Sequence, residues 1–273
     1  MRTEPSRALR RATRAAVATL ACSAAQSAVA ESQSSYVLGS ALVAAPEYSG
    51  AEQNALKLRP LLAYQYGRFR FATSRAGALL GADGYSAGAT ADLVSADRFR
   101  FGAGLRIDPG RKASDSDDLA GLPEIRRTLR GRLYGSWAFD RNWTLISVLS
   151  QDLLGRAGGA TASLDLGFGD RLTARSTWSA GGGFSFANER HMRTYYGVDA
   201  AASRRSSFAA YEPDGGAKDV HFGVGARSVL APQWTGFAGV GVTRLLGDAA
   251  ASPLAKSATS LSANVGVAYR CCK

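Results

Sequence analysis

Few side chains of this 273-residue chain could do acid–base, redox or metal chemistry. There are two histidines, His191 and His221, and one adjacent pair of cysteines, Cys271 and Cys272. A histidine can activate a serine for attack on an ester, whereas a disulfide between adjacent cysteines would strain the peptide unit that joins them. No spacing of cysteine, histidine and carboxylate is typical of a metal site, and no glycine-rich loop is typical of phosphate binding. The sequence therefore indicates no metal and no cofactor, and it leaves catalysis by a histidine as a weak hypothesis.

A tetrapeptide of alternating arginine and phenylalanine occurs twice, at 68–71 and at 98–101. Cations interleaved with aromatics could bind nucleic acid. Alternation is also the pattern of a β-strand, because successive side chains point to opposite faces. The second stretch continues the alternation to residue 107, with Ala103, Leu105 and Ile107 on the face of the phenylalanines. A strand with one apolar face and one arginine-bearing face therefore accounts for both stretches.

The first thirty residues have the features of a secretory signal peptide. A basic start is followed by an apolar stretch and then by two small residues, Ala28 and Ala30, that mark a cleavage site. We expect residues 1–30 to be removed and residues 31–273 to form a single domain. Five of the 33 basic and one of the 22 acidic residues lie in this segment, so the formal charge falls from +11 to +7. An exported chain with scattered cations is not expected to bind nucleic acid.

The rest of the chain alternates between apolar and polar residues over many short segments. None of it approaches the ~20 consecutive apolar residues that a membrane helix needs, which excludes a helical membrane protein. The alternating segments number about twelve, an even number as bacterial outer-membrane barrels require. They lie near residues 36–44, 57–66, 68–75, 86–94, 98–107, 126–139, 142–152, 157–168, 171–186, 218–229, 233–245 and 260–271.

The connections between these segments alternate in length. Tight turns are expected at residues 67, 95–97, 140–141, 169–170 and 231–232. Longer loops are expected at 45–56, 76–85, 108–125, 187–217 and 246–259, and only the loop at 153–156 is short. Short periplasmic turns and long external loops are typical of outer-membrane barrels. We therefore predict an all-β, antiparallel transmembrane barrel of the outer membrane, surrounded by lipid and lipopolysaccharide.

The alternation assigns the side chains of each strand either to the lipid or to the lumen. Aromatic residues that follow tight turns would form a girdle at the periplasmic interface: Phe69, Phe99, Trp143 and Trp234. The opposite face, which carries the arginines of both tetrapeptides, would line the lumen with Arg98, Arg100, Arg106, Arg130, Arg132, His221, Arg227 and Arg270. Such a lining would favour anions in an open lumen, or it would pack a closed interior if Asp92 and Asp165 neutralised it. The strand number leaves both states open.

Short motifs follow one another in a fixed order along the expected loops and the last strand. They are Pro46-Glu47-Tyr48-Ser49-Gly50, then Gly110-Arg111 with Asp117-Asp118-Leu119-Ala120-Gly121-Leu122 and Glu124-Ile125, then Tyr195-Tyr196-Gly197-Val198, Ser252-Pro253-Leu254 and Val267-Ala268-Tyr269-Arg270. With these motifs the chain resembles, from about Tyr36 to Cys271, the MipA/OmpV family of outer-membrane proteins, the MltA-interacting proteins. The resemblance implies a non-enzymatic barrel with no catalytic residues to transfer. Some members are described as scaffolds that join a lytic murein transglycosylase to a peptidoglycan synthase, and others as porin-like or adhesive proteins.

The C-terminus departs from the usual pattern of such barrels. They end on an outward-facing aromatic residue, whereas here Cys271 occupies that position after Tyr269 and Arg270. Either Tyr269 serves as the terminal aromatic, or insertion of the barrel is slower. For the cysteine pair, a disulfide between molecules in the oxidising periplasm is favoured over a redox function.

Three functions remain open. The favoured hypothesis is a scaffold for murein-synthesising and murein-cleaving enzymes, and the second is a narrow channel with a preference for anions. The third is a lipid-modifying enzyme that uses His221 or His191. The alternation points His221 into the lumen, away from the lipid, which disfavours this enzyme hypothesis.

Overall fold

The computed structural model describes residues 34–73 and 87–271. The expected signal peptide, with Ala28 and Ala30, and the expected loop 76–85 lie outside the described residues. Within the described ranges, no helix is long and apolar enough to cross a membrane.

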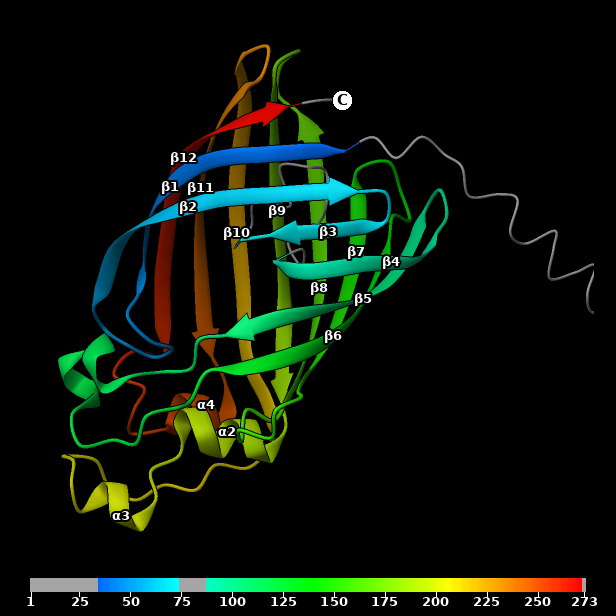
Figure 1. Cartoon of the computed structure of the whole chain (residues 1–273). Helices are drawn as coiled ribbons and strands as arrows, with labels where there is room; N and C mark the ends of the chain where they lie inside the picture. The colour runs from blue at the N-terminus through cyan, green and yellow to red at the C-terminus, as the bar shows by residue number, and fades with distance from the viewer. Residues whose placement is uncertain (1–33, 74–86, 272–273) are drawn as a thin grey trace, which may run out of the picture.

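The described residues form twelve antiparallel strands that close into a barrel (Figure 1). Each strand pairs with its neighbours in sequence, and β1 pairs with β12 over the register from Tyr36↔Cys271 to Ala44↔Ala263. The predicted all-β barrel is therefore confirmed. The strands are β1 (Ser35–Pro46), β2 (Asn54–Tyr66), β3 (Phe69–Ala72), β4 (Gly88–Ser95), β5 (Phe99–Asp108), β6 (Thr128–Trp137), β7 (Trp143–Asp152), β8 (Ala160–Arg171), β9 (Ser176–Ala187), β10 (Gly216–Ala231), β11 (Trp234–Leu245) and β12 (Thr259–Cys271).

One tight turn lies elsewhere than the sequence suggested. Gly169 and Asp170 belong to β8, and the chain reverses at residues 172–175 instead. The pairing of β8 with β9 continues through Asp170↔Trp178 and Arg171↔Thr177, because a glycine in a barrel strand does not by itself end the ladder. At this end β8 is consequently three residues longer than the expected strand 157–168, whereas β9 begins at Ser176, later than the expected start at residue 171.

The two ends of the barrel differ in structure (Figure 1). The tight turns lie at one end of the barrel, together with the start of β1 and the end of β12. We call this the turn end. The long connections share the opposite, loop end, where the described loops contain short helices that the sequence did not predict. These are η2 (Ala113–Asp115), η3 (Asp117–Leu119), α2 (Glu189–Tyr196), α3 (Ala200–Ser203) and α4 (Gly247–Ala251).

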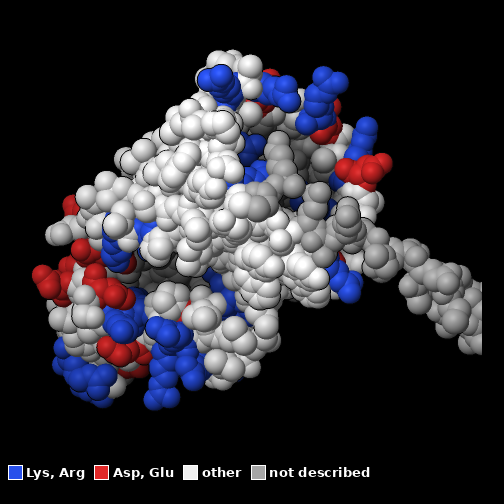
Figure 2. Space-filling model, turned by 45° about the horizontal axis from the view of Figure 1, so that its top comes forward, with Lys and Arg blue, Asp and Glu red and all other residues white. Residues whose placement is uncertain are grey.

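The outer surface of the strands is apolar. Val240, Leu261 and Val265 are 63%, 64% and 56% exposed, although Val240 and Val265 lie in the middle of strands that are paired on both edges. In Figure 2 an uncharged band separates two ends that carry the lysine, arginine, aspartate and glutamate side chains. A band of this kind suits a surface in contact with lipid.

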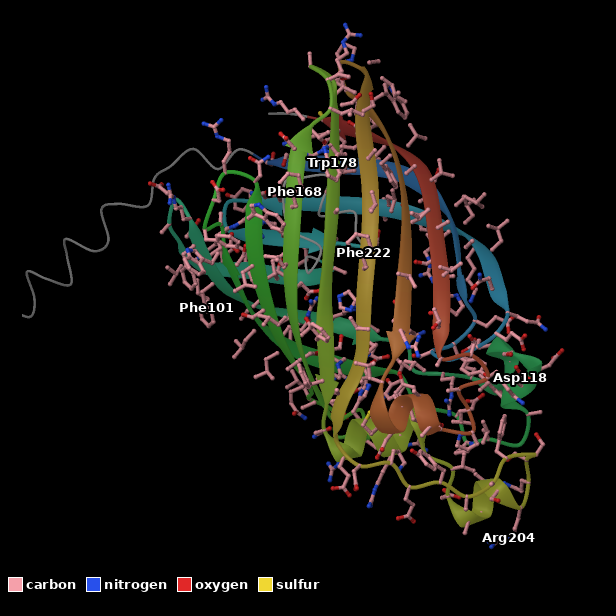
Figure 3. The ribbon with its side chains drawn as sticks, turned by 180° about the vertical axis from the view of Figure 1, so that it is seen from behind. Phe101, Asp118, Phe168, Trp178, Arg204 and Phe222 are labelled. Carbon is pink, nitrogen blue, oxygen red and sulfur yellow. The ribbon has the colours of Figure 1, made fainter. Side chains whose placement is uncertain are left out.

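Aromatic side chains gather at the turn end of this band. The four expected girdle residues Phe69, Phe99, Trp143 and Trp234 are all exposed there. Further rings join them through neighbouring strands, since Trp143 lies 5.0 Å from Phe168, Phe168 lies 5.3 Å from Trp178, and Trp234 lies 5.4 Å from Tyr269, measured between ring centroids. Phe168 and Trp178 are seen side by side in Figure 3.

The interior is not uniformly polar. On the wall formed by β1, β2 and β12, small and aliphatic side chains pack against Phe237 of β11: Val37, Ala41, Leu61, Ala63 and Ala268. Val37 is fully buried, and Ala268 is 2% exposed. This wall fills part of the barrel, so the polar lumen lies on the side of the other strands.

The two faces of a strand should respond in opposite ways to a new charge. Val265→Arg places a guanidinium in the apolar band and should lower the free energy of unfolding by about 2–4 kcal/mol. Ser262→Arg, on the cavity side of the same strand β12, should lower it by about 1 kcal/mol or less. Urea titration of the barrel refolded into lipid vesicles measures the free energy of unfolding of both variants. Equal losses for the two variants would contradict the assignment of faces.

Candidate functional site

The barrel contains a cavity of about 1550 Å³, lined mainly by strands β5 to β12. Figure 2 shows lysine and arginine side chains around a hollow at the turn end. Five of the eight residues that we expected in the lumen line this cavity: Arg106, Arg130, Arg132, His221 and Arg227.

The other three expected lumen residues lie elsewhere. Arg98 is exposed in the turn between β4 and β5, and Arg100 is half-buried on β5 opposite Ser136. Arg270 is half-buried on β12 opposite Val37. None of the three is among the described residues that line the cavity.

A buried ion pair joins β3 to β4. Neither of its residues is among the eight that we expected to line the lumen. Arg70, the second arginine of the first tetrapeptide, is 6% exposed and forms a salt bridge with Asp92. The Tyr134 hydroxyl donates a hydrogen bond of 2.8 Å to the same carboxylate. Gly102 lies directly against the Tyr134 ring, where any side chain would collide with it. This corner of the interior is therefore closed and neutralised.

His221 lies between two carboxylates. Its Nε2 is 2.6 Å from Asp165 and its Nδ1 is 3.1 Å from Asp219. Asp219 also forms a salt bridge with Lys218, and the Ser163 hydroxyl donates to Asp165 at 3.0 Å. Because both ring nitrogens face carboxylates, neither is placed to take a proton from a serine. His221 has the contacts of a structural charge and not of a catalytic base.

Arg130 forms the floor of the cavity towards the loop end. It is 6% exposed and donates from Nε to Ser150 Oγ at 2.9 Å and from Nη1 to the Gly158 carbonyl at 3.0 Å. Its Nη1 also lies 3.5 Å from Asp108, whose carboxylate accepts a 2.9 Å bond from the Tyr195 hydroxyl. Arg130 is thus both paired and fully hydrogen-bonded, which is what a buried guanidinium requires.

His191 of α2 lies beside this floor. Its Nδ1 is 2.9 Å from the Gly158 carbonyl, which can only accept, so the Nδ1 hydrogen must donate. Its ring stacks on Tyr195 with 4.4 Å between centroids. Burial lowers the pKa of His191 to about 4, and burial also raises the pKa of Tyr195. His191 is therefore neutral at physiological pH.

Above the floor, four loops pack a second hydrophobic core, which we call the loop cap. Tyr48, Leu119 and Leu254 come from different loops and are 8%, 1% and 1% exposed. Burial, followed by the nearby Asp118 carboxylate, raises the pKa of Tyr48 to about 12. The buried side chains of the loop cap are Tyr48, Ala51, Leu119, Leu122, Val198, Ala202, Phe208 and Leu254.

Polar contacts tie the loops of the cap to the end of α2. Ser49 Oγ lies 2.7 Å from the Tyr196 hydroxyl, and the Ser252 hydroxyl donates to the Tyr196 carbonyl at 2.6 Å. Arg111 Nη1 donates to the Tyr195 carbonyl at 2.9 Å, and burial lowers the pKa of Arg111. The four loop motifs singled out from the sequence therefore meet in one structure. In Figure 1 these loops, with α2 and α4, lie across the loop end of the barrel.

The turn end carries a different feature. The β8–β9 and β10–β11 hairpins extend beyond the neighbouring turns (Figure 1). Their tips are joined by a 2.9 Å hydrogen bond from the Val229 amide to the Arg175 carbonyl. Leu172 and Leu230 on these tips are 67% and 62% exposed. We call residues 171–175 and 228–233 the hairpin platform.

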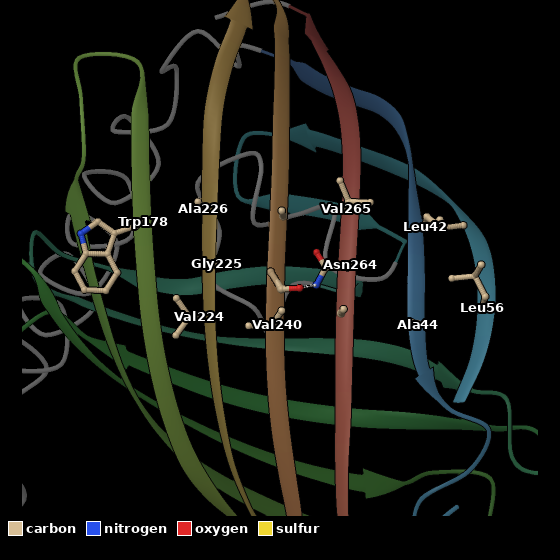
Figure 4. A pocket seen from close by; sticks show the side chains of 13 residues that line it. Leu42, Ala44, Leu56, Trp178, Val224, Gly225, Ala226, Val240, Asn264 and Val265 are labelled. Atoms are coloured by element: carbon tan, nitrogen blue, oxygen red, sulfur yellow. Dashed lines mark hydrogen bonds between the residues drawn. The ribbon is translucent and has the colours of Figure 1, made fainter. Parts of the chain in front are cut away.

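A smaller hollow of about 490 Å³ is apolar (Figure 4). Leu42, Leu56 and Trp178 line it together with small residues of β10 to β12, and Asn264 donates to the Gly239 carbonyl there at 3.4 Å. No charged side chain is among the described residues that line it. It offers apolar contact and no group for acid–base chemistry.

The cysteine pair is described only in part. Cys271 is disulfide-bonded, and Cys22 and Cys272 lie outside the described residues. Tyr269, which we considered as the terminal aromatic, pairs with Trp234 in the register of β11 and β12. The last strand therefore contributes one ring to the girdle.

Comparison with known proteins gives one family and several distant barrels. A family model described as MltA-interacting protein MipA matches residues 38–271. No curated protein matches the chain significantly in sequence. The solved NanC porin has 6% identity, a TM-score of 0.41 and coverage of 86% of this chain and 98% of its own. An anion-selective porin from Comamonas acidovorans has 9% identity, a TM-score of 0.40 and coverage of 87% and 98%. The Pseudomonas putida toluene transporter TodX has 13% identity, a TM-score of 0.37 and coverage of 88% and 90%. Similarities at this level do not bear on what the chain binds.

Removing one member of the buried ion pair should be far more harmful than removing both charges. Arg70→Met leaves the Asp92 charge buried and should lower the free energy of unfolding by about 3–5 kcal/mol. Adding Asp92→Asn removes that charge but keeps an acceptor for Tyr134, so the double variant should recover most of the loss. Urea titration in lipid vesicles measures the free energy of unfolding of the single and the double variant. A double variant as unstable as Arg70→Met would show that the pair is not the cause.

His191 should make the loop cap sensitive to acid. Its pKa is lower in the folded protein, about 4, than its ordinary value of 6.5, so the unfolded state binds the proton first. Stability is therefore complete above pH 6.5 and falls as the pH falls towards 4, by about 3 kcal/mol at most. Thermal unfolding between pH 7.5 and 4.5 should show a steeper loss for the wild type than for His191→Gln. If the unfolding temperatures of the two proteins fell in parallel with pH, His191 would not be the buried neutral group that makes the protein sensitive to acid.

Proposed function

This chain belongs to the MipA family, and from that premise we propose that it is a non-enzymatic scaffold that binds a lytic murein transglycosylase at the periplasmic face of the outer membrane. The family description names an interaction with MltA, a murein transglycosylase. A peptidoglycan synthase is the second partner that such a scaffold would hold.

The hairpin platform is the observation that carries this proposal. Tight turns of outer-membrane barrels face the periplasm, where enzymes acting on murein are found. Leu172 and Leu230, 67% and 62% exposed, are apolar side chains beyond the aromatic girdle. Exposed apolar groups rimmed by polar residues are typical of protein-binding surfaces, and Arg171 and Arg175 supply such a rim. The hydrogen bond between the Val229 amide and the Arg175 carbonyl holds the two tips as one surface.

The loop cap supports the same function indirectly. Its packed side chains cover the lumen at the loop end, which disfavours a wide channel for diffusion. The barrel then serves to anchor a binding surface in the membrane. A periplasmic partner reaches only the turn end of such a barrel.

Charge placed on the platform should weaken the complex. The barrel in nanodiscs should bind a purified lytic transglycosylase in surface plasmon resonance. The double variant Leu172→Glu with Leu230→Glu should bind at least about tenfold more weakly, which is about 1.4 kcal/mol. Arg204→Glu, exposed at the opposite end of the molecule (Figure 3), is the matched control and should bind like the wild type.

Two outcomes would contradict the scaffold. One is the absence of binding by a wild-type barrel that retains its heat-modifiable folded form. The other is an equal loss of affinity in the platform variant and in Arg204→Glu, since the surface would then not be the platform.

A narrow channel with a preference for anions is the second candidate, favoured by the cations of the cavity. Arg106 and Arg227 line it and are exposed to it. Planar-bilayer recordings should show a small conductance with anion preference, and Arg106→Glu with Arg227→Glu should reverse that preference. Absence of conductance would remove this candidate and leave the scaffold untouched.

A further inference from the structure

Four carboxylates of the barrel interior already contact basic side chains. Asp92 pairs with Arg70, and Asp108 pairs with Arg130. Asp165 and Asp219 both contact His221, and Asp219 also contacts Lys218. These acids therefore have little capacity left to neutralise the remaining cations of the cavity.

Three arginines at the turn end of the same cavity have no such partner. Arg141, Arg171 and Arg227 line it, and none forms an ion pair with a carboxylate of the described residues. Asp140 and Asp170 directly precede Arg141 and Arg171, but each accepts a hydrogen bond from the backbone amide of the residue that follows it, at 2.6 and 2.7 Å, and forms no ion pair with that side chain. Positive charge thus remains at this opening.

The register holds two of these arginines on one face. Arg171 of β8 is opposite Thr177 of β9, and Thr177 is opposite Arg227 of β10. The two arginines are two strand spacings apart, roughly 10 Å along the sheet. Arg227 Nε donates to Thr177 Oγ1 at 2.9 Å, which orients its guanidinium.

The third arginine comes from the adjoining turn. Arg141 lies between β6 and β7, and the next residue, Asn142, donates from Nδ2 to the Gly169 carbonyl of β8 at 2.8 Å. This bond fixes the turn beside the strand that carries Arg171. The three guanidinium groups therefore border one opening.

Like charges gathered at the mouth of a barrel repel one another and attract anions, because the low-dielectric walls focus their field. Guanidinium groups bind carboxylate and phosphate through paired N–H donors. The cavity behind them, about 1550 Å³, is larger than the ~300–1,000 Å³ of most small-molecule sites. It has room for a small ligand with its water.

We propose that the turn end of the lumen binds a small polyanion that carries carboxylate or phosphate groups, held by Arg141, Arg171 and Arg227. The ligand enters from the periplasm, because the described loops cover the other end. The site does not depend on a murein enzyme at the platform or on conduction through the barrel.

Calorimetry of the folded barrel in detergent at low ionic strength tests this site. Citrate and inorganic phosphate are the two probes, and saturable binding of citrate, of phosphate or of both is expected, the pattern identifying the anion class. Arg171→Gln with Arg227→Gln should weaken binding at least about tenfold, because two of the three charges are lost. Arg227→Lys keeps the charge without the paired donors and should give an intermediate affinity.

Arg68→Gln is the matched control, since Arg68 lies at the same end over the Phe69 ring and does not line the cavity. It should bind both probes like the wild type. Absence of saturable binding for both probes would overturn the proposal, as would an equal loss in Arg68→Gln. Leu172→Ser with Leu230→Ser removes the apolar groups of the platform without adding charge beside Arg171, and it should leave probe binding unchanged, which separates this site from the scaffold.

Discussion

The closed ladder of backbone hydrogen bonds is the constraint on which the rest of the structure depends. Lipid offers no partner for a peptide N–H or C=O, so every strand must pair on both edges. The pairing of β1 with β12 removes the last free edges. Once the ladder is closed, each side chain is committed to one face. Val240 must then be apolar, whereas its neighbour Gly239, on the other face, has no such requirement.

Closure also decides how charge is distributed inside. The cations that are buried away from the water of the cavity are matched to acids, because a buried charge needs a partner: Arg70 with Asp92, and Arg130 with Asp108. Towards the loop end Asp108 also accepts a hydrogen bond from Tyr195, and His191 lies beside Arg130 under the packed loops. At the turn end Arg70 is paired, but Arg141, Arg171 and Arg227 border the opening without an ion pair to a carboxylate of the described residues. One end is thus neutral and covered, and the other is charged and accessible.

Period-two alternation predicted the strands from sequence, because the face on which a side chain lies is a local property. The position of an arginine along the barrel axis depends on strand tilt and stagger, so alternation alone did not separate Arg106, which lines the cavity, from Arg98, which lies in a turn. The loop cap was also missed, since Tyr48, Leu119 and Leu254 meet only after the barrel has closed. The family motifs pointed to it: Gly121, at φ +80°, lies against the Arg205 carbonyl, where any side chain would collide.

A scaffold of the kind we propose requires that the turn end of the barrel binds a periplasmic murein enzyme. Photocrosslinking in intact cells, with a photoreactive amino acid in place of Leu172 or of Arg204, tests it most directly. The probe at Leu172 should capture a lytic transglycosylase or a peptidoglycan synthase, and the probe at Arg204 should capture neither. Capture of such an enzyme from Arg204 alone, or from neither position in a folded barrel, would contradict it.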